Sequence, residues 1–198
     1  MKKRILFFVS FGCCIFGLLL LSFGGWIRAK ALLARYLLNR SWRISLETGR
    51  PVKPWPWADS WPVGRLRTAD GEIDLVILEG DSGEVLAFGP GHVSGSGRIA
   101  GAGHCILAGH RDTSFSFLEK LKKNDVLVLQ GMNGSVKFYS VQSFLIKRAS
   151  ELYFDGEADN RLTLITCYPF STVLPGGDLR YLVFAESISA GQFLDRQI

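Results

Sequence analysis

Hydrophobic and polar residues follow two different patterns along the chain. Residues 5–27 contain no charged side chain, and a helix of this length would match the hydrocarbon thickness of a bilayer, about 30 Å. After residue 64 the pattern changes to short runs rich in β-branched, aromatic and aliphatic residues, which are typical of strands. These runs are 65–68, 73–79, 105–108, 126–130, 136–146, 162–166 and 181–187. The pattern predicts an N-terminal helix followed by a β-rich domain.

The β-rich part carries few helical signals. Asn133 and Gly134 separate two of the runs and predict a tight hairpin, because both residue types tolerate positive φ. One stretch, 115–122, has a helical pattern, with Phe117 and Leu118 on its apolar face. Seven or eight short strands with little helix favour an all-β fold, a closed or nearly closed β-barrel, over a layered α/β fold.

The N-terminal helix is predicted to be a membrane anchor over residues 1–28. A cleaved signal peptide is the competing interpretation, but the apolar run exceeds the usual h-region of about 7 to 15 residues. Residues 29–60 are predicted to be an amphipathic helix, over 29–46, followed by a linker rich in proline and tryptophan. Four prolines between 51 and 62 mark the boundary with the next domain. The tryptophans of that segment could cover the edge of the domain or lie at a bilayer interface. Residues 61–198 are then the folded domain.

Charge is distributed unevenly. Residues 1–53 hold ten Lys and Arg against one acid, a net charge of +9, so the rest of the chain carries −4 of the total of +5. Because the positive excess lies beside the apolar segment, anionic lipid explains it better than nucleic acid, and we expect no nucleic-acid partner. Basic residues flank the segment on both sides and do not fix its orientation. We expect a single-pass protein of the cell (inner) membrane with its domain on the periplasmic or extracellular side, as a catalytic role would require.

The cysteines do not form a disulfide framework. Cys13 and Cys14 lie in the apolar run, which leaves Cys105 and Cys167 in the β-rich domain. One bridge between these two is an open alternative. We favour Cys105 as an inward-facing strand residue and Cys167 as a reactive thiol.

Three reactive side chains stand at the ends of apolar strands: His110, Cys167 and Arg180. A thiol attacks well only as a thiolate, so a nucleophilic cysteine needs a proton acceptor such as His110. Attack on an amide builds negative charge on the carbonyl oxygen, which the Arg180 guanidinium could hold. Each residue alone also has an ordinary explanation, as a buried core cysteine, a loop histidine or a solvated arginine. His92 and His104 fit the role of loop hydrogen-bond partners.

The run Thr163-Leu-Ile-Thr-Cys167 resembles the TLxTC signature of the sortase family. His110 stands in the matching Ala-Gly-His context, and Arg180 follows the cysteine by thirteen residues. The similarity extends from about residue 61 to 187 and is closest to class D-like sortases and those of Gram-negative bacteria. It implies an eight-stranded sortase-type barrel with one or two short helices.

The resemblance also implies an activity. A sortase cleaves an LPxTG-like sorting signal near the C-terminus of a protein substrate, which here would leave a thioester on Cys167, and transfers the acyl group to an amine acceptor. The alternative is a membrane-anchored cysteine protease that releases the peptide to water. A third reading is a catalytically silent binding domain on the same barrel.

The substrate groove would lie, by the same resemblance, between the loops at about 149–161 and 171–178. Leu152, Tyr153 and Phe154 could form an apolar pocket there, or they could be half-buried strand residues. Thr166 is expected to line the groove beside the nucleophile.

No cofactor is expected. Some sortases bind calcium through loop carboxylates, and Asp155, Glu157 and Asp159 alternate in a suitable loop. They lack the glycine and the distal glutamate of a recognisable calcium loop, so a solvated loop is favoured.

Overall fold

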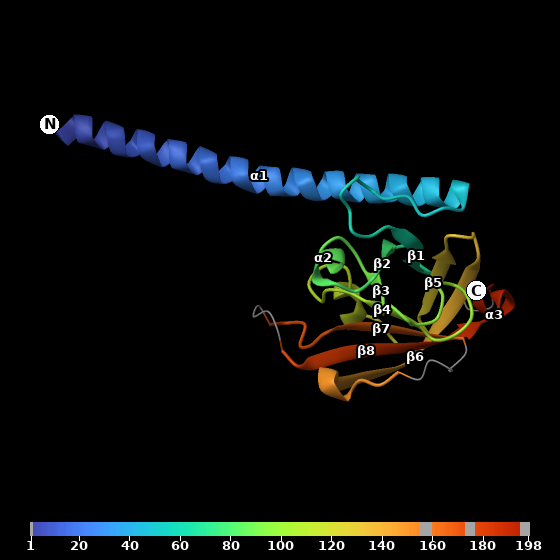
Figure 1. The fold of residues 1–198 in the computed structure, drawn as a ribbon. Helices are drawn as coiled ribbons and strands as arrows, with labels where there is room; N and C mark the ends of the chain where they lie inside the picture. The colour runs from blue at the N-terminus through green and yellow to red at the C-terminus, as the bar shows by residue number, and fades with distance from the viewer. Residues whose placement is uncertain (1, 155–159, 173–176, 195–198) are drawn as a thin grey trace. The chain divides into compact units, whose positions relative to one another are not determined.

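The computed structural model describes residues 2–154, 160–172 and 177–194. Eight strands in this part of the chain close into a barrel in the order β1-β2-β3-β4-β7-β8-β6-β5 (Figure 1). The strands are β1 (Pro62–Thr68), β2 (Asp74–Glu79), β3 (Gly91–His92), β4 (Cys105–Ala108), β5 (Val126–Gly131), β6 (Val136–Arg148), β7 (Arg161–Cys167) and β8 (Leu179–Ile188). The helices are α1 (Lys2–Thr48), α2 (Gly83–Leu86), η1 (Ser116–Glu119), η2 (Ala149–Glu151) and α3 (Ala190–Leu194). The predicted all-β barrel is confirmed.

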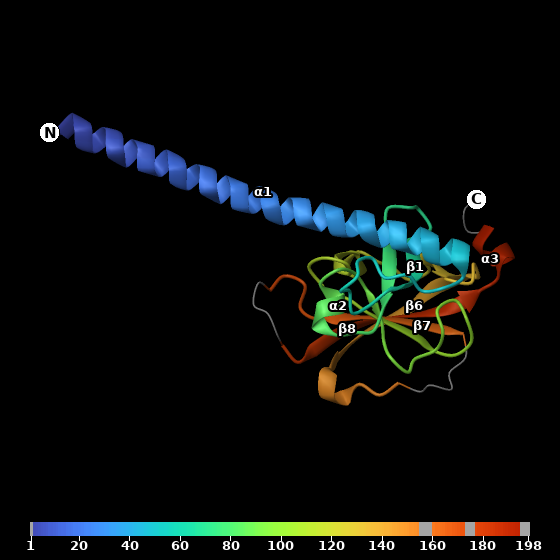
Figure 2. The same ribbon diagram turned by 45° about the horizontal axis from the view of Figure 1, so that its top comes forward.

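Two parallel pairings set the topology. β2 pairs with β3 and β4 pairs with β7 in parallel, whereas the other neighbouring strands are antiparallel. The strands β6, β8 and β7 lie side by side (Figure 2). Because β4 and β7 run in the same direction and β8 runs back, the ends of β4 and β7 meet the start of β8 at one end of the barrel.

The core fills the inside of the barrel with aliphatic and aromatic side chains. Alternate residues of each strand point inward, as the period of two along a strand requires. The core residues from β4, β7 and β8 are Cys105, Leu107, Leu162, Leu164, Val183 and Ala185. Phe115 and Leu118, from the segment after β4, are fully buried against them. The ends of β4 and β7 are thus anchored in a packed interior.

Three local predictions need correction. The helix expected over 115–122 is the short 3-10 helix η1, since the chain turns at Asn124, with φ of +74°, to enter β5. At the hairpin only Gly134 has positive φ, and its N–H donates to the carbonyl of Gly131 at 3.0 Å. The sequence pattern also missed β3, whose two residues are too few to show any periodicity.

The N-terminal helix α1 is one continuous helix of 47 residues. It ends where Gly49 adopts the left-handed conformation, with φ of +66°, just before Pro51. Among the residues that the structure describes, no helix has an apolar stretch long enough to cross a membrane, so the structure does not support the span predicted at 5–27.

The chain divides into two compact units, 1–37 and 38–198. In the second unit, Leu38 and Trp42 at the end of α1 are buried. Two hydrogen bonds tie Val52, in the segment after α1, to the last turns of this helix. The Ser41 hydroxyl donates to the Val52 carbonyl, and the Val52 N–H donates to the Ser45 hydroxyl at 3.0 Å.

Of the tryptophans in the proline-rich segment, Trp55 packs against a small apolar cluster that includes Leu38 and Val85. Trp55 therefore covers the edge of the domain. Trp57, in contrast, is 79% exposed.

Candidate active site

The register of β7 and β8 places Cys167 directly opposite Arg180. Facing residues on antiparallel strands have Cβ atoms about 4.5–5.5 Å apart and share one face of the sheet. The sequence predicted that both residues are reactive, but it did not predict that they are cross-strand partners. Backbone pairing therefore places the two residues side by side on one face of the sheet.

His110 reaches the same place from the other side of Cys167. β4 runs parallel to β7 with Ala108 opposite Ile165, and the N–H of Gly109 donates to the Ile165 carbonyl at 3.1 Å. His110 follows Ala108 by two residues, just as Cys167 follows Ile165 by two, so the same register places His110 beside Cys167. The three predicted catalytic residues thus stand at the ends of three neighbouring strands, with the cysteine in the middle.

All three residues occupy the outer face of the barrel. Leu107 on β4, Leu164 on β7 and Val183 on β8 point into the core, and residues of opposite parity on each strand point outward. His110, Cys167 and Arg180 have that opposite parity, and each is half-buried. Their side chains can therefore be reached by a substrate from outside the barrel.

Arg180 is held by the backbone around it. Its Nη1 donates to the carbonyl oxygens of Gly177 at 2.7 Å and of Leu179 at 3.0 Å. In the described part of the chain, neither the Cys167 thiol nor the His110 ring forms a hydrogen bond. Catalytic hydrogen bonds are often long in a substrate-free enzyme and tighten when substrate binds.

Thr166 positions the ends of β4 and β7 relative to each other. Its side chain is 2% exposed, and its hydroxyl donates to the carbonyl of Gly109 at 2.7 Å. The sequence predicts that Thr166 lines the groove, but its side chain lies on the inner side of β7, and its hydroxyl bonds to the residue before His110. Its structural role is to hold the histidine strand beside the cysteine strand.

Replacing Thr166 by valine tests this role, because valine keeps the shape and removes the donor. We expect a loss of about 1 kcal/mol in the free energy of unfolding and a decrease of about tenfold in the turnover of a cleavable peptide. Thr68→Val serves as the control, since Thr68 also bonds through its hydroxyl, to Asp70, but lies in β1. Equal losses of turnover in the two variants would contradict the positioning role.

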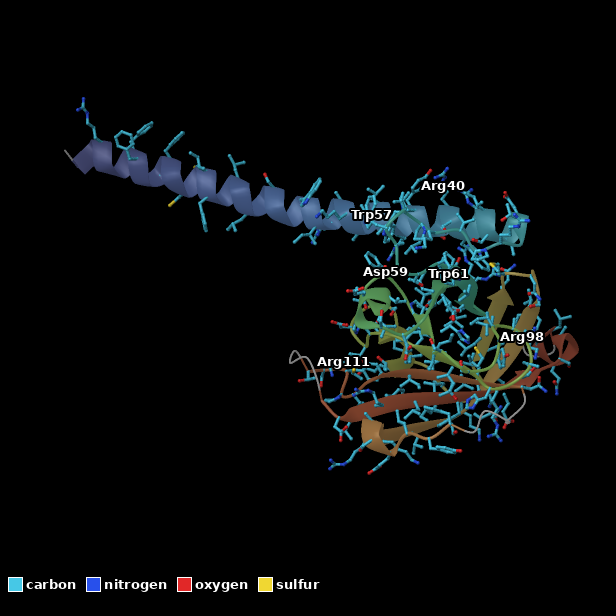
Figure 3. The ribbon with its side chains drawn as sticks, viewed as in Figure 1. Arg40, Trp57, Asp59, Trp61, Arg98 and Arg111 are labelled. Atoms are coloured by element: carbon cyan, nitrogen blue, oxygen red, sulfur yellow. The ribbon has the colours of Figure 1, made fainter. Side chains whose placement is uncertain are left out.

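Arg111 is a residue that the sequence reasoning missed. Its side chain is 9% exposed, and its Nη2 donates to the carbonyl of Thr172 at 3.2 Å (Figure 3). This bond joins the segment after His110 to the loop after Cys167. The only signal in the sequence was a charged residue next to the candidate histidine, which an exposed loop would equally produce.

A cavity of about 210 Å³ lies along the outer face of the same strands. Leu182 and Phe184, which have the parity of Arg180 on β8, are among its lining residues. The predicted pocket residues Leu152, Tyr153 and Phe154 line it as well. The structure therefore places these residues at one cavity, on the face that carries the reactive side chains.

The far end of this cavity is built around His104. Its Nε2 lies 2.7 Å from the Thr163 hydroxyl, and its ring meets that of Phe154 edge-on, with 6.0 Å between the ring centroids. His104 thus supports the cavity wall, which agrees with its predicted role as a hydrogen-bond partner. The calcium candidates Asp155, Glu157 and Asp159 lie outside the described residues.

Cys105 and Cys167 are both free thiols, so the alternative of a bridge between them is wrong for this structure. Cys105 is 1% exposed in the core, as predicted. Burial raises the pKa of its thiol to about 12, against a smaller lowering by the charge of Lys137. A thiol that is both inaccessible and protonated at neutral pH is unreactive.

Thiol labelling should therefore separate the two cysteines. In a background with Cys13→Ser and Cys14→Ser, which removes the two exposed thiols of α1, iodoacetamide at pH 8 is expected to modify Cys167 and leave Cys105 unmodified. Peptide mapping by mass spectrometry gives the site. Labelling of Cys105 at a comparable rate in the folded protein would contradict the assignment.

Fold and site together define an eight-stranded barrel that carries a cysteine, a histidine and an arginine on adjacent strands. The family model for the sortase domain matches residues 67–188, more than half of the 198-residue chain. The chain belongs to the sortase family.

Known members of the family show how far the likeness reaches. Sortase D of Bacillus subtilis (strain 168) is 31% identical over 118 residues, which are 59% of this chain and 59% of that protein. Sortase A from Corynebacterium diphtheriae has a TM-score of 0.57 at 25% identity, over 67% of this chain and 63% of that one. Sortase C-1 from Actinomyces oris has a TM-score of 0.52 at 28% identity, over 65% and 73%. The chain therefore spans less than two thirds of the length of the first two relatives.

Proposed function

We propose that this protein is a cysteine transpeptidase that cleaves an LPxTG-like sorting signal and joins the acyl fragment to an amine. One observation carries the proposal: Cys167 is paired with Arg180 across two strands and has His110 level with it on the other side. A nucleophile, a proton carrier and a fixed cation are the three groups that acyl transfer through a thioester requires.

In the first half of the proposed reaction, the Cys167 sulfur attacks the carbonyl carbon of the scissile Thr–Gly amide. The thiol proton passes to His110, and the negative charge that forms on the carbonyl oxygen faces the Arg180 guanidinium. When the C–N bond breaks, His110 gives its proton to the departing amine. The products are a thioester on Cys167 and a peptide with a free amino terminus.

In the second half, an incoming amine attacks the thioester carbonyl. His110 takes the proton of the amine, the Cys167 sulfur leaves as a thiolate when the new amide forms, and His110 returns the proton to the sulfur, which restores the enzyme. Where the groove excludes water, an amine competes well with hydrolysis for a thioester. Water as the acceptor would instead make the protein a cysteine hydrolase.

The cavity lined by Leu152, Tyr153 and Phe154 supports the assignment of the substrate. A Leu-Pro pair at the start of the signal needs apolar contacts on the same face as the nucleophile, and these side chains offer them in a cavity that also has the charged residues Lys147, Glu151 and Arg161 in its lining. Contact between these residues and the peptide stays a prediction.

Two further predictions accompany the proposal. The similarity to Sortase D of Bacillus subtilis supports the predicted likeness to class D-like sortases, and the likeness to sortases of Gram-negative bacteria stays a prediction. A place at the cell membrane, with the domain on its periplasmic or extracellular side, stays a prediction from the sequence, as does the absence of a cofactor.

Product analysis tests the proposal. The full chain is incubated with a peptide containing an LPxTG signal, with and without triglycine as the amine, and the products are identified by mass spectrometry. A transpeptidase gives the triglycine adduct as the main product. Only free acid, at an unchanged rate in both reactions, would assign the protein to the hydrolases.

Arg180→Lys is expected to lower kcat/KM by about 100-fold or more. An ammonium keeps the charge but cannot reproduce the fork of N–H donors, and it loses the bonds that hold Arg180 to the Gly177 and Leu179 carbonyls. Arg148→Lys is the control. Arg148 lies opposite Leu179, next to Arg180 in the register of β6 and β8, but it is exposed and forms an ion pair with Asp178. Full activity of Arg180→Lys would show that a positive charge alone stabilises the oxyanion, and it would contradict the proposed role of the guanidinium donors.

A further inference from the structure

A second and larger cavity, of about 430 Å³, lies in the domain apart from the site described above. It shares none of its described lining residues with the cavity that Leu152, Tyr153 and Phe154 line. Its floor is formed by the buried side chains of Leu38, Leu78 and Val85, which come from the end of α1, β2 and α2. The proline-rich segment before β1 supplies the rest of the wall on this side, including Trp55, Trp57 and Asp59.

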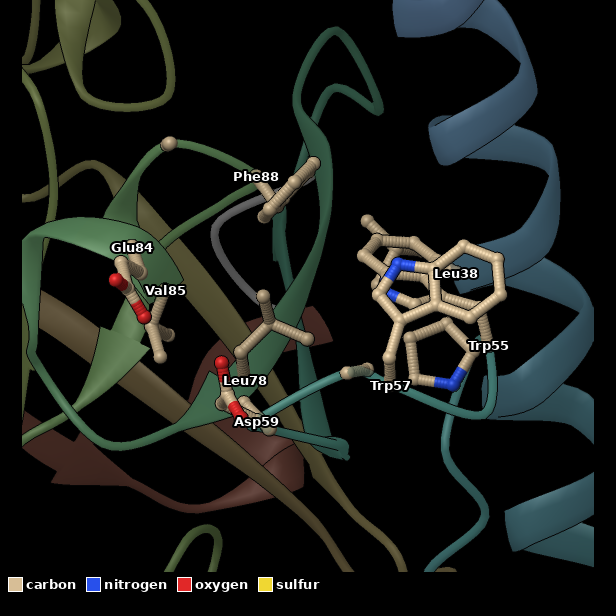
Figure 4. Close-up of a pocket in the computed structure, with 12 residues that line it drawn as sticks. Leu38, Trp55, Trp57, Asp59, Leu78, Glu84, Val85 and Phe88 are labelled. Atoms are coloured by element: carbon tan, nitrogen blue, oxygen red, sulfur yellow. The ribbon is translucent and has the colours of Figure 1, made fainter.

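The walls of this cavity are aromatic. Trp55 meets Phe88 edge-on, with 5.0 Å between the ring centroids, and Trp57 lies beside Trp55 (Figure 4). Trp57 is 79% exposed and Phe88 is 48% exposed, although both are large apolar residues. Exposed apolar side chains that gather around one cavity, unlike single scattered ones, mark interaction sites.

The rim carries two carboxylates. Asp59 and Glu84 line the cavity across from the tryptophans (Figure 4). Neither forms an ion pair with another residue in the described part of the chain. No lysine, arginine or histidine is among the described residues that line the cavity, although the whole chain has a net charge of +5. The cavity is therefore apolar and aromatic with an uncompensated negative rim.

An apolar, aromatic cavity with carboxylates at its rim favours a ligand that has a cationic group on a hydrocarbon chain. Aromatic faces attract cations by about 0.5–2 kcal/mol, depending on how far the site is desolvated. Carboxylates add charge-assisted hydrogen bonds only to a cation that has N–H donors, which a quaternary ammonium lacks. A guanidinium satisfies both, because it stacks on indole rings and presents a planar fork to a carboxylate.

We propose that this cavity binds an arginine side chain of a partner polypeptide. The volume exceeds what one arginine side chain fills, and the apolar floor over Leu38 and Leu78 leaves space for a neighbouring apolar side chain of the same segment. The partner is thus a polypeptide segment in which an arginine adjoins leucine-like residues. This site is separate from the thioester chemistry and does not rest on it.

The test uses the full chain and two synthetic peptides, acetyl-Leu-Arg-Leu-amide and acetyl-Leu-citrulline-Leu-amide. Citrulline has nearly the shape of arginine but no charge. Binding is followed by tryptophan fluorescence and by calorimetry, so the readout is independent of catalysis. The arginine peptide is expected to bind at least about fivefold more tightly than the citrulline peptide, as a cation held by aromatic rings and carboxylates should.

Two variants locate the binding. The double variant Asp59→Asn, Glu84→Gln and the single variant Trp57→Leu should each reduce the affinity for the arginine peptide by about fivefold or more. Asp81→Asn is the matched control, since Asp81 is also an exposed acid between β2 and α2 but does not line the cavity. It should bind the arginine peptide as the parent chain does.

Three results would overturn the proposal. Equal binding of the arginine and citrulline peptides would make the cavity an apolar cleft without charge selection. Stronger competition by tetramethylammonium than by methylguanidinium would assign it to a small quaternary ammonium ligand. Self-association of the full chain that the Asp59→Asn, Glu84→Gln variant abolishes would make the occupant a second copy of this protein.

Discussion

Cys167→Ala is expected to abolish peptide cleavage and transfer, with a loss of at least about 10⁴-fold in kcat. Without the sulfur no thioester can form, and neither His110 nor Arg180 can replace the nucleophile from its own strand. The rate is measured with a peptide carrying a fluorophore and a quencher on either side of an LPxTG signal. Because Cys167 is a half-buried residue at the end of β7, the thermal unfolding of the variant should match that of the parent chain.

The control for this variant is Cys105→Ala. Cys105 is the other cysteine of the barrel, but it lies in the core, and its loss should lower stability while leaving cleavage at Cys167 largely intact. If Cys105→Ala were inactive and Cys167→Ala active, both with a native fold, the assignment of the nucleophile would be wrong.

His110→Ala is expected to lower kcat by about 10³-fold or more, since proton transfer typically contributes 10²–10⁴-fold and this ring serves both halves of the reaction. The variant lacks a group to take the thiol proton and to protonate the departing amine. Steady-state rates with and without added imidazole are the measurement. Partial recovery by imidazole, which a merely structural histidine would not show, is the predicted result.

His92→Asn provides the comparison for this variant. The His92 ring is 9% exposed, with one nitrogen 2.9 Å from the Gly97 carbonyl and the other 3.4 Å from the Glu79 carboxylate, so its loss should weaken the fold. Imidazole should not change the rate of this variant. A rate for His110→Ala within tenfold of the parent chain would remove His110 from the proposed mechanism.

Most of the strands could be predicted from the sequence because they alternate between core and surface. β4 was predicted with its observed bounds, 105–108, since both of its ends are marked by polar or glycine residues. The long strand β6 was predicted to end at 146 but continues to Arg148, because its pairing with β8 extends to the Arg148 and Leu179 positions. Strand length at such an edge is set by the partner strand, which a local pattern does not contain.

The site was only partly predictable. The residue types at 110, 167 and 180 indicated nucleophilic chemistry, and the resemblance to sortases gave them roles. The pairing of Cys167 with Arg180 depends on the register of two strands, and the bond of Arg111 to Thr172 depends on two loops that meet at the end of the barrel. Contacts between distant segments of this kind follow from the closed topology and not from local sequence.

The central claim is that Cys167 becomes acylated by a peptide. Mass spectrometry of the intact full chain, quenched in acid soon after mixing with an LPxTG peptide, tests it most directly. We predict a mass increase equal to the free peptide acid that ends at the threonine, less one water, located at Cys167, removed by hydroxylamine and absent from Cys167→Ala. If the peptide is cleaved while the chain stays unmodified at every mixing time, or if the adduct lies at another residue, the account is contradicted.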